Sequence, residues 1–136
     1  MVELKRMNYK TKAFAKINVF LKVCGKYPNG YHRLLMLMQE IDIGDDIEIS
    51  LDSGKEFEIE LICSDSRIEV SKNLCYKAAK LFYERLSVKF PHKVQEYTSI
   101  KAIKNTPSEA GLGGGSSDAA AVLVVLQEHF GQPFSE

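Results

Sequence analysis

The most informative segment of the chain reads Gly111-Leu112-Gly113-Gly114-Gly115-Ser116-Ser117-Asp118 and leads directly into the apolar run 119–126. The alanines and the length of that run favour a helix. Glycines have no Cβ and let the backbone approach a ligand closely, and the N–H groups at the start of a helix point at any anion that lies there. The segment therefore predicts a loop for phosphate groups at a helix start.

Three other interpretations of this loop are weaker. The P-loop of nucleoside triphosphatases needs a lysine after its last glycine, and here Ser116 follows Gly115. The dinucleotide-binding fingerprint is disfavoured by the spacing. The structural alternative is a flexible surface loop with a serine or aspartate helix cap, but consecutive glycines carry an entropy cost that an ordinary connection has no reason to bear.

Upstream of the loop, alternating apolar residues predict strands. From Ala13 to Val23 every odd position is apolar, which predicts a strand with one buried face. Asn29-Gly30 in the turn-rich segment 25–30 predicts a hairpin. Further extended segments are expected at 34–43, 47–51 and 57–63, with turns at 43–46 and 52–55. The pattern favours an antiparallel meander of four strands.

Helical spacing replaces alternation after residue 73. Leu74, Ala78, Leu81, Phe82 and Leu86 share one helical face, and Ser71 or Asn73 is available as the N-cap. A short strand is expected at 97–104. The predicted fold class is α+β, an antiparallel sheet with covering helices.

Length and composition exclude several classes of protein. The chain has 136 residues, about one domain, and its 18 basic residues balance 18 acidic ones, so no overall field favours nucleic acid or an anionic membrane. Its longest apolar run is too short to cross a bilayer and no leader precedes it, which predicts a cytoplasmic protein without membrane contact. The three cysteines have no metal-binding spacing, and His92 and His129 are interpreted as surface or packing residues.

Three segments together resemble the GHMP kinase superfamily. They are Ala15 to Leu21, Gly30-Tyr31-His32 followed by residues 39–45, and the glycine loop from Pro107 to Ala120. The resemblance extends from about Ala13 to about Phe130 and implies the ribosomal-protein-domain-like fold of the family's amino-terminal, ATP-binding domain. Residues 1–136 are expected to form that domain in truncated form, because the family continues into a carboxy-terminal domain that carries a catalytic aspartate. The chain alone is therefore expected to bind weakly and turn over poorly.

The resemblance also implies an activity. Within the superfamily, the segments match the branch that uses ATP, with its Mg²⁺, to phosphorylate the 2-hydroxyl of a methylerythritol joined to cytidine diphosphate, in the non-mevalonate route to isoprenoids. No metal ligand is assigned. The nucleotide-binding residues implied are Asn73, Lys104, Pro107, Gly111, Leu112, Gly113, Gly114, Gly115, Ser116 and Ser117.

Four residues are assigned to substrate and catalysis by the same resemblance. Tyr31 and His32 correspond to a cytosine clamp, with packing as the structural alternative. Lys16 is the catalytic candidate, and strand alternation places Asn18 beside it as a substrate-binding residue. A solvated lysine at a strand edge is the alternative for Lys16.

Two other functions stay open. A sibling kinase for mevalonate, homoserine or a sugar would share the glycine loop but would not need Tyr31 and His32. A non-catalytic RNA-binding module of similar fold is disfavoured by the zero net charge. Self-association of the chain is expected if the truncation leaves apolar surfaces uncovered.

Overall fold

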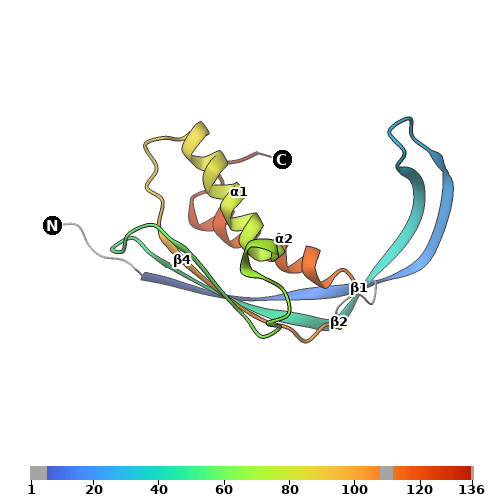
Figure 1. The fold of residues 1–136 in the computed structure, drawn as a ribbon, viewed down its shortest axis with the longest axis horizontal. Coiled ribbons are helices and arrows are strands. Elements are labelled where there is room, and N and C mark those ends of the chain that lie inside the picture. Colours follow the sequence, from blue (N-terminus) through green and yellow to red (C-terminus); the bar gives the residue numbers. More distant parts are fainter. Residues whose placement is uncertain (1–5, 108–111, 136) are drawn as a thin grey trace.

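The computed structural model describes residues 6–107 and 112–135 as a sheet with two helices on one face (Figure 1). The elements in chain order are β1 (Arg6–Lys26), β2 (His32–Asp52), β3 (Ile59–Cys63), a short 3₁₀ turn (Val70–Lys72), α1 (Leu74–Lys89), β4 (Tyr97–Ile103) and α2 (Gly114–His129). This is the α+β class expected from the sequence.

The sheet is mixed, and the predicted antiparallel meander is wrong. The strand order is β1-β2-β4-β3, with β1–β2 and β2–β4 antiparallel and β3–β4 parallel. The reason is α1, which connects β3 to β4. A strand, a crossover helix and a second strand in one sheet form a unit whose strands run in parallel. The fourth strand along the chain therefore enters between β2 and β3.

The turn predicted at 43–46 is also wrong, because β2 runs through it without a break. Gly44 instead allows a close approach of β1, since a Cβ on it would lie 2.6 Å from the carbonyl oxygen of Ala13. The pairing of the two strands shifts register nearby, between Phe14 and Lys16. The glycine thus marks an irregularity in a strand pair rather than a chain reversal.

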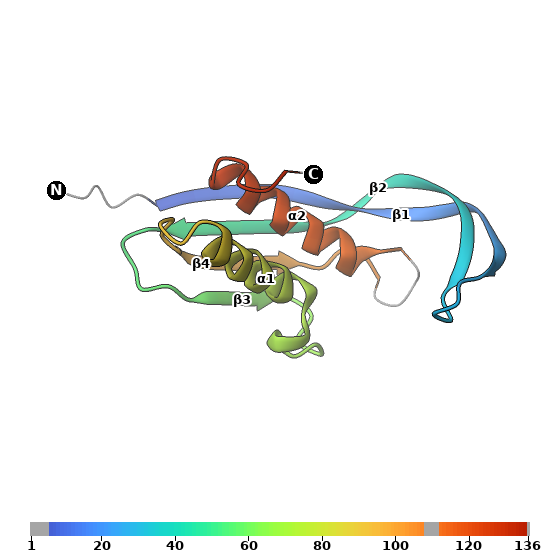
Figure 2. The same cartoon turned by 90° about the horizontal axis from the view of Figure 1, so that it is seen from above.

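Beyond the helices, β1 and β2 continue as a two-stranded arm, residues 17–40 (Figures 1 and 2). Ala13 and Ala15 are buried as expected, but the predicted buried face is wrong from Ile17 onward because neither α1 nor α2 covers the arm. Val19, for example, is 60% exposed. The predicted hairpin turn is confirmed: Gly30 has a φ of 89° and its N–H donates to the Tyr27 carbonyl at 3.0 Å.

The core lies between the helices and the inner half of the sheet. Alternate residues of β2, namely Ile47, Ile49 and Leu51, are buried against the helices. On α1, the predicted cap is confirmed, because the Asn73 side chain accepts a hydrogen bond from the Cys75 N–H at 2.9 Å. This packing fixes where α1 and α2 begin over the sheet.

Candidate functional site

The glycine loop forms the first turn of α2. Gly113 precedes the helix with a left-handed φ of 68°, and the Ser117 N–H donates to the Gly113 carbonyl at 2.9 Å. This is the first i to i−4 bond of the helix, so the N–H groups of residues 114–116 have no acceptor within it. Gly111 lies outside the described residues, and Pro107 is exposed just before the same gap.

Each of the three consecutive glycines lies against a neighbouring side chain. A Cβ on Gly113 would lie 3.1 Å from Cε of Lys16, one on Gly114 would lie 3.2 Å from Cγ2 of Thr106, and one on Gly115 would lie 3.3 Å from Cδ1 of Leu74. These separations are tighter than ordinary van der Waals contact. The glycines therefore let the helix start pack tightly on the protein, which is a second reason for them beside approach to a ligand.

Strand β1 is bonded directly to this helix start. The Lys16 N–H donates to the Leu112 carbonyl at 2.9 Å, and the Ser117 hydroxyl donates to the Phe14 carbonyl at 2.7 Å. The Lys16 side chain passes along Gly113. Lys16 and the glycine loop are thus held together by backbone bonds, although residues 16 and 113 are far apart in sequence.

An open cleft of about 600 Å³ lies where β1, β2 and the helix start meet. It is lined by Phe14, Ala15, Lys16, Met38, Glu40, Gly113, Ser116 and Ser117. The structure therefore brings the catalytic candidate Lys16 to the predicted phosphate loop. The roles assigned to these residues stay predictions.

The start of α1 lies beside the start of α2, as the contact between Leu74 and Gly115 shows. Each helix carries a partial positive charge at its amino-terminal end, so two such ends at one place favour a bound anion. Asn73 lies at this place, but its side-chain oxygen is occupied as the cap of α1. Its contact with a nucleotide stays a prediction.

Lys104 is held between two carboxylates. Its Nζ donates to Oδ2 of Asp45 at 2.5 Å and to Oδ2 of Asp118 at 2.6 Å, and its side chain is 14% exposed. The other oxygen of Asp45 accepts the N–H groups of Asn105 at 2.6 Å and Thr106 at 2.8 Å. We call Asp45, Lys104 and Asp118 the Lys104 cluster. It joins β2, the end of β4 and the first turns of α2.

The two carboxylates of the Lys104 cluster are held differently. Burial, followed by the neighbouring Asp45, raises the pKa of Asp118 to about 7 in spite of the bond from Lys104. Burial would also raise the pKa of Asp45, but hydrogen bonds, above all that from Lys104, lower it below the ordinary value. The carboxylates in turn raise the pKa of Lys104 against the effect of its burial. Asp45 and Lys104 thus keep their charges, while Asp118 changes charge near neutral pH.

The other substrate candidates do not line the cleft. Asn18 is exposed and pairs with Met38 in the arm. Tyr31 is 73% exposed and His32 begins β2, so both lie at the tip of the arm. The structure places these two residues side by side but apart from Lys16. Their role as a cytosine clamp is untested and stays a prediction.

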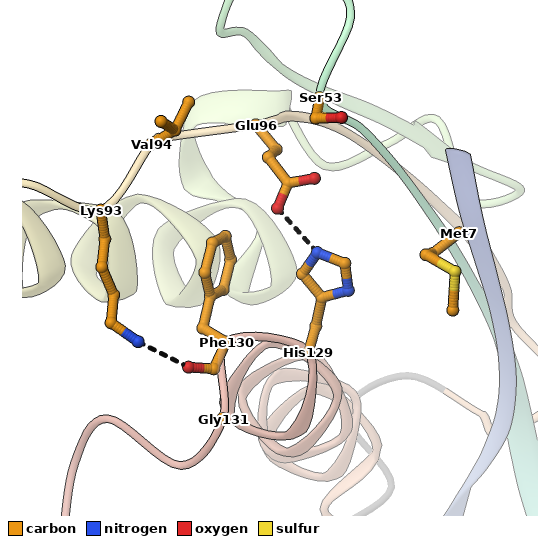
Figure 3. Close-up of a pocket in the computed structure, with 8 residues that line it drawn as sticks. All are labelled: Met7, Ser53, Lys93, Val94, Glu96, His129, Phe130 and Gly131. Atoms are coloured by element: carbon orange, nitrogen blue, oxygen red, sulfur yellow. Dashed lines mark hydrogen bonds and ion pairs between the residues drawn. The ribbon is translucent and has the colours of Figure 1, made fainter. Parts of the chain in front are cut away.

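A second polar cluster holds the far end of α2 (Figure 3). His129 lies with Nε2 2.7 Å from Oε2 of Glu96 and Nδ1 2.7 Å from the Tyr9 hydroxyl, beside a pocket of about 570 Å³. With the proton on Nε2, the histidine donates to Glu96 and accepts from Tyr9. His129 is a packing residue at the end of a helix, as interpreted from the sequence.

Sequence reasoning missed both polar clusters as units. Asp45 and Lys104 are 59 positions apart, and His129 and Tyr9 are 120 apart. No local pattern connects residues at such separations. Only the ladder between β2 and β4, and the position of α2 over β1, bring them together.

The described part of the chain lacks two features. Residues 6–107 and 112–135 contain no group of three or more histidine, cysteine, aspartate or glutamate side chains arranged to hold a metal ion. Within the same residues, neither helix combines the length and the apolar character that a bilayer crossing requires.

Comparison with known proteins agrees with this geometry. Residues 73–136 match the model of the GHMP kinases N terminal domain. A 4-diphosphocytidyl-2-C-methyl-D-erythritol kinase of Clostridium beijerinckii is 45% identical over 89% of this chain and 40% of its own length. The protein of the same name from Clostridium kluyveri is 47% identical over 86% of this chain and 39% of its own length. The chain therefore spans about two-fifths of the curated relatives that it matches.

Solved structures show the same relation. The crystal structure of a 4-(cytidine 5'-diphospho)-2C-methyl-D-erythritol kinase superposes with a TM-score of 0.73 at 30% identity, over 93% of this chain and 42% of that one. A homoserine kinase from Cytophaga hutchinsonii superposes with a TM-score of 0.58 at 20% identity, over 93% of this chain and 37% of its own, which shows the shared fold alone. By sequence and by fold, the chain is a homologue of the amino-terminal part of the GHMP kinases named 4-diphosphocytidyl-2-C-methyl-D-erythritol kinase.

Proposed function

We propose that residues 1–136 form the ATP-binding domain of a kinase that transfers the γ-phosphoryl group of ATP to the 2-hydroxyl of 4-diphosphocytidyl-2-C-methyl-D-erythritol. The names of the relatives support this substrate. The observation that carries the proposal is the cleft in which Lys16 meets the start of α2.

The residues of the cleft fit a nucleotide phosphate. Amides of residues 114–116 precede the first helical bond, two helix starts lie together, and Lys16 adds a full positive charge beside them. ATP brings Mg²⁺, which neutralises phosphate charge during transfer. Glu40 is the carboxylate among the described residues that line the cleft, and the ligands of the ion are left unassigned.

Lys16 would act on the transfer itself. Its ammonium group would stabilise the negative charge that develops on the phosphoryl group and would orient the attacking hydroxyl. Tyr31 and His32 would hold the cytosine from the tip of the arm, with Asn18 between them and the cleft on β1. The substrate would then lie along the arm.

The proposal is tested in the full-length gene product that contains this chain. With ATP, Mg²⁺ and the substrate, mass spectrometry should detect one added phosphoryl group. Lys16→Met should lower kcat by about a hundredfold or more, because removing one group that stabilises transition-state charge has that order of effect. The control is Lys10→Met, on the same strand with its side chain 82% exposed, which should keep wild-type activity. Transfer that is unaffected in Lys16→Met would contradict the proposed role.

A sibling GHMP kinase is the second candidate, because such a kinase would share the glycine loop of this sequence. Thermal-shift measurements with cytidine monophosphate, homoserine and mevalonate separate the two. Stabilisation by the cytidine nucleotide supports the first proposal, and stabilisation by homoserine or mevalonate alone rejects it.

We also propose a cytoplasmic protein that binds no nucleic acid, in keeping with its balanced charge. Self-association is proposed through the arm, whose apolar side chains are exposed along its length.

A further inference from the structure

The Lys104 cluster lies behind the glycine loop rather than in the cleft. Lys104 is absent from the described residues that line the cleft, and its Nζ lies 3.5 Å from where a Cβ on Gly114 would stand. Its ammonium group donates hydrogen bonds to the carboxylates of Asp45 and Asp118. The charge of Lys104 is therefore paired within the protein, next to the start of α2.

The cluster reaches each segment that shapes the loop. Asp118 belongs to α2 one residue after the glycine-serine segment, and Asp45 follows the glycine at which β2 touches β1. Through Oδ1, Asp45 also holds the backbone of Asn105 and Thr106, the residues that lead toward the loop. One ammonium group thus ties together the strand pair, the approach to the loop and the helix that follows it.

The hydrogen bonds of the Lys104 cluster are buried, so water does not readily replace them. Asp45 is fully buried and Asp118 is 3% exposed. Oδ1 of Asp118 and Oγ1 of Thr106 are buried without a hydrogen-bond partner among the described residues. Losing one member of a buried charge cluster leaves the others uncompensated, which is far more costly than losing an exposed pair.

We propose that Asp45 and Asp118 are positioning residues: through Lys104 they hold the start of α2 against β1 and so set the place of the phosphate loop beside Lys16. The consequence for nucleotide binding rests on the proposed function, whereas the consequence for the loop itself does not.

The two ends of α2 are held separately, which provides a matched control. The Lys104 cluster holds the amino-terminal end, and Glu96 with Tyr9 holds the carboxy-terminal end through His129. At a pH above the pKa of Asp118, Asp118→Asn and Asp45→Asn each remove one carboxylate charge at the loop end. Glu96→Gln removes one carboxylate charge at the far end of the same helix, 2.7 Å from its partner.

The first measurement is hydrogen exchange of two reporter amides in the 136-residue chain. Ser117 N–H bonds to Gly113 and Lys16 N–H bonds to Leu112, so both report how the helix start is held. In Asp118→Asn and Asp45→Asn we expect exchange of both amides to rise about tenfold, the effect of losing one bond in a buried charged cluster. In Glu96→Gln it should stay within about twofold of wild type, because distant sites act independently.

The second measurement is the affinity for an ATP analogue by calorimetry on the same variants of the full-length gene product. Weaker binding by about tenfold is expected in Asp118→Asn and Asp45→Asn but not in Glu96→Gln. Unchanged reporter exchange in the two cluster variants, or an equal rise in Glu96→Gln, overturns the inference. Selective loosening of the loop, together with a full-length protein that binds no nucleotide, leaves the inference standing and rejects the proposed function.

A third variant covers the case in which single substitutions unfold the chain. Lys104→Met combined with Asp118→Leu and Asp45→Asn removes all three charges together, which a buried ion cluster often tolerates, and the amide oxygen at position 45 can still accept from the N–H groups of Asn105 and Thr106. The inference predicts a folded protein with faster exchange at Ser117 and Lys16. Wild-type exchange in this folded triple variant would overturn it.

Discussion

At the residue scale, the ionisable groups around the carboxyl group of Asp118 have pKa values far from that of Asp118. It faces Lys104, whose pKa is raised from 10.5, Asp45, whose pKa is lowered from 3.8, and Cys75 on α1, whose pKa burial raises to about 12. Asp118, with a pKa of about 7, is therefore the member of this group that changes charge between pH 4 and pH 7.

This predicts how stability depends on pH. Between pH 4 and pH 7 the folded chain keeps a proton on Asp118 that the unfolded chain has released, so this residue's contribution to the free energy of unfolding falls as pH rises. Relative to Asp118→Asn, which cannot titrate, wild type should lose roughly 3 kcal/mol across this window. Urea unfolding at several pH values measures the difference. Glu128→Gln, at an exposed position of the same helix, is the control, and a gap that is constant or grows with pH contradicts the prediction.

Single residues differ in how far the sequence could predict them. The family resemblance made Lys16 the catalytic candidate, and the structure brings it to the glycine loop. The partners of Lys104 could not be found, because Asp45 and Asp118 meet it only through strand pairing and helix docking. Approach to a ligand could be predicted as one reason for the three consecutive glycines. Their tight packing could not, because the side chains that they contact come from β1, α1 and the segment after β4.

At the scale of elements, Gly44 controls how β1 and β2 pair. A Cβ there would lie 2.6 Å from the Ala13 carbonyl oxygen, which is backbone and cannot turn aside. Gly44→Ala should therefore lower the free energy of unfolding by roughly 2–4 kcal/mol, as overpacking does in a rigid core. Guanidinium unfolding measures this. Asp42→Ala, at an exposed position of the same strand, is the control, and equal stability of the two variants would show that the strands separate easily.

Local patterns predicted the existence of the elements better than their pairing. Both helices and the strand at 97–104 are confirmed, because apolar spacing and the Asn73 cap act within a few residues. The parallel pair of β3 and β4 was missed, since its cause is the crossover through α1. The break expected at residues 43–46 was wrong because a glycine that suits a turn also suits close contact between strands.

At the scale of the whole molecule, the arm leaves an apolar surface in contact with water. Leu35 and Leu37 of β2 are 57% and 59% exposed, and Phe20 of β1, which pairs with Leu37, is 48% exposed. Hydrophobic periodicity predicted a buried face here because it reports that a surface is apolar and not what covers it. We expect the 136-residue chain to self-associate through this surface.

Charges placed on the arm should reverse that association. In sedimentation experiments, Leu35→Lys combined with Leu37→Lys should shift the average mass toward that of a monomer, because burying two ammonium groups in an apolar contact is costly. Val88→Lys, on α1 at a position that is 83% exposed, should leave the mass unchanged. A wild-type chain that is monomeric at all concentrations would refute the prediction.

The single strand β1 runs from Tyr9, which meets the far end of α2, to Lys16, which meets its beginning. Because side chains alternate across a strand, inserting or deleting one residue in this interval would present Ala15 or Ile17 to the loop in place of Lys16. The number of residues between Tyr9 and Lys16 is therefore fixed by the length of α2, because each of the two residues contacts one end of that helix. Homologues should therefore keep the number of residues between positions 9 and 16 constant.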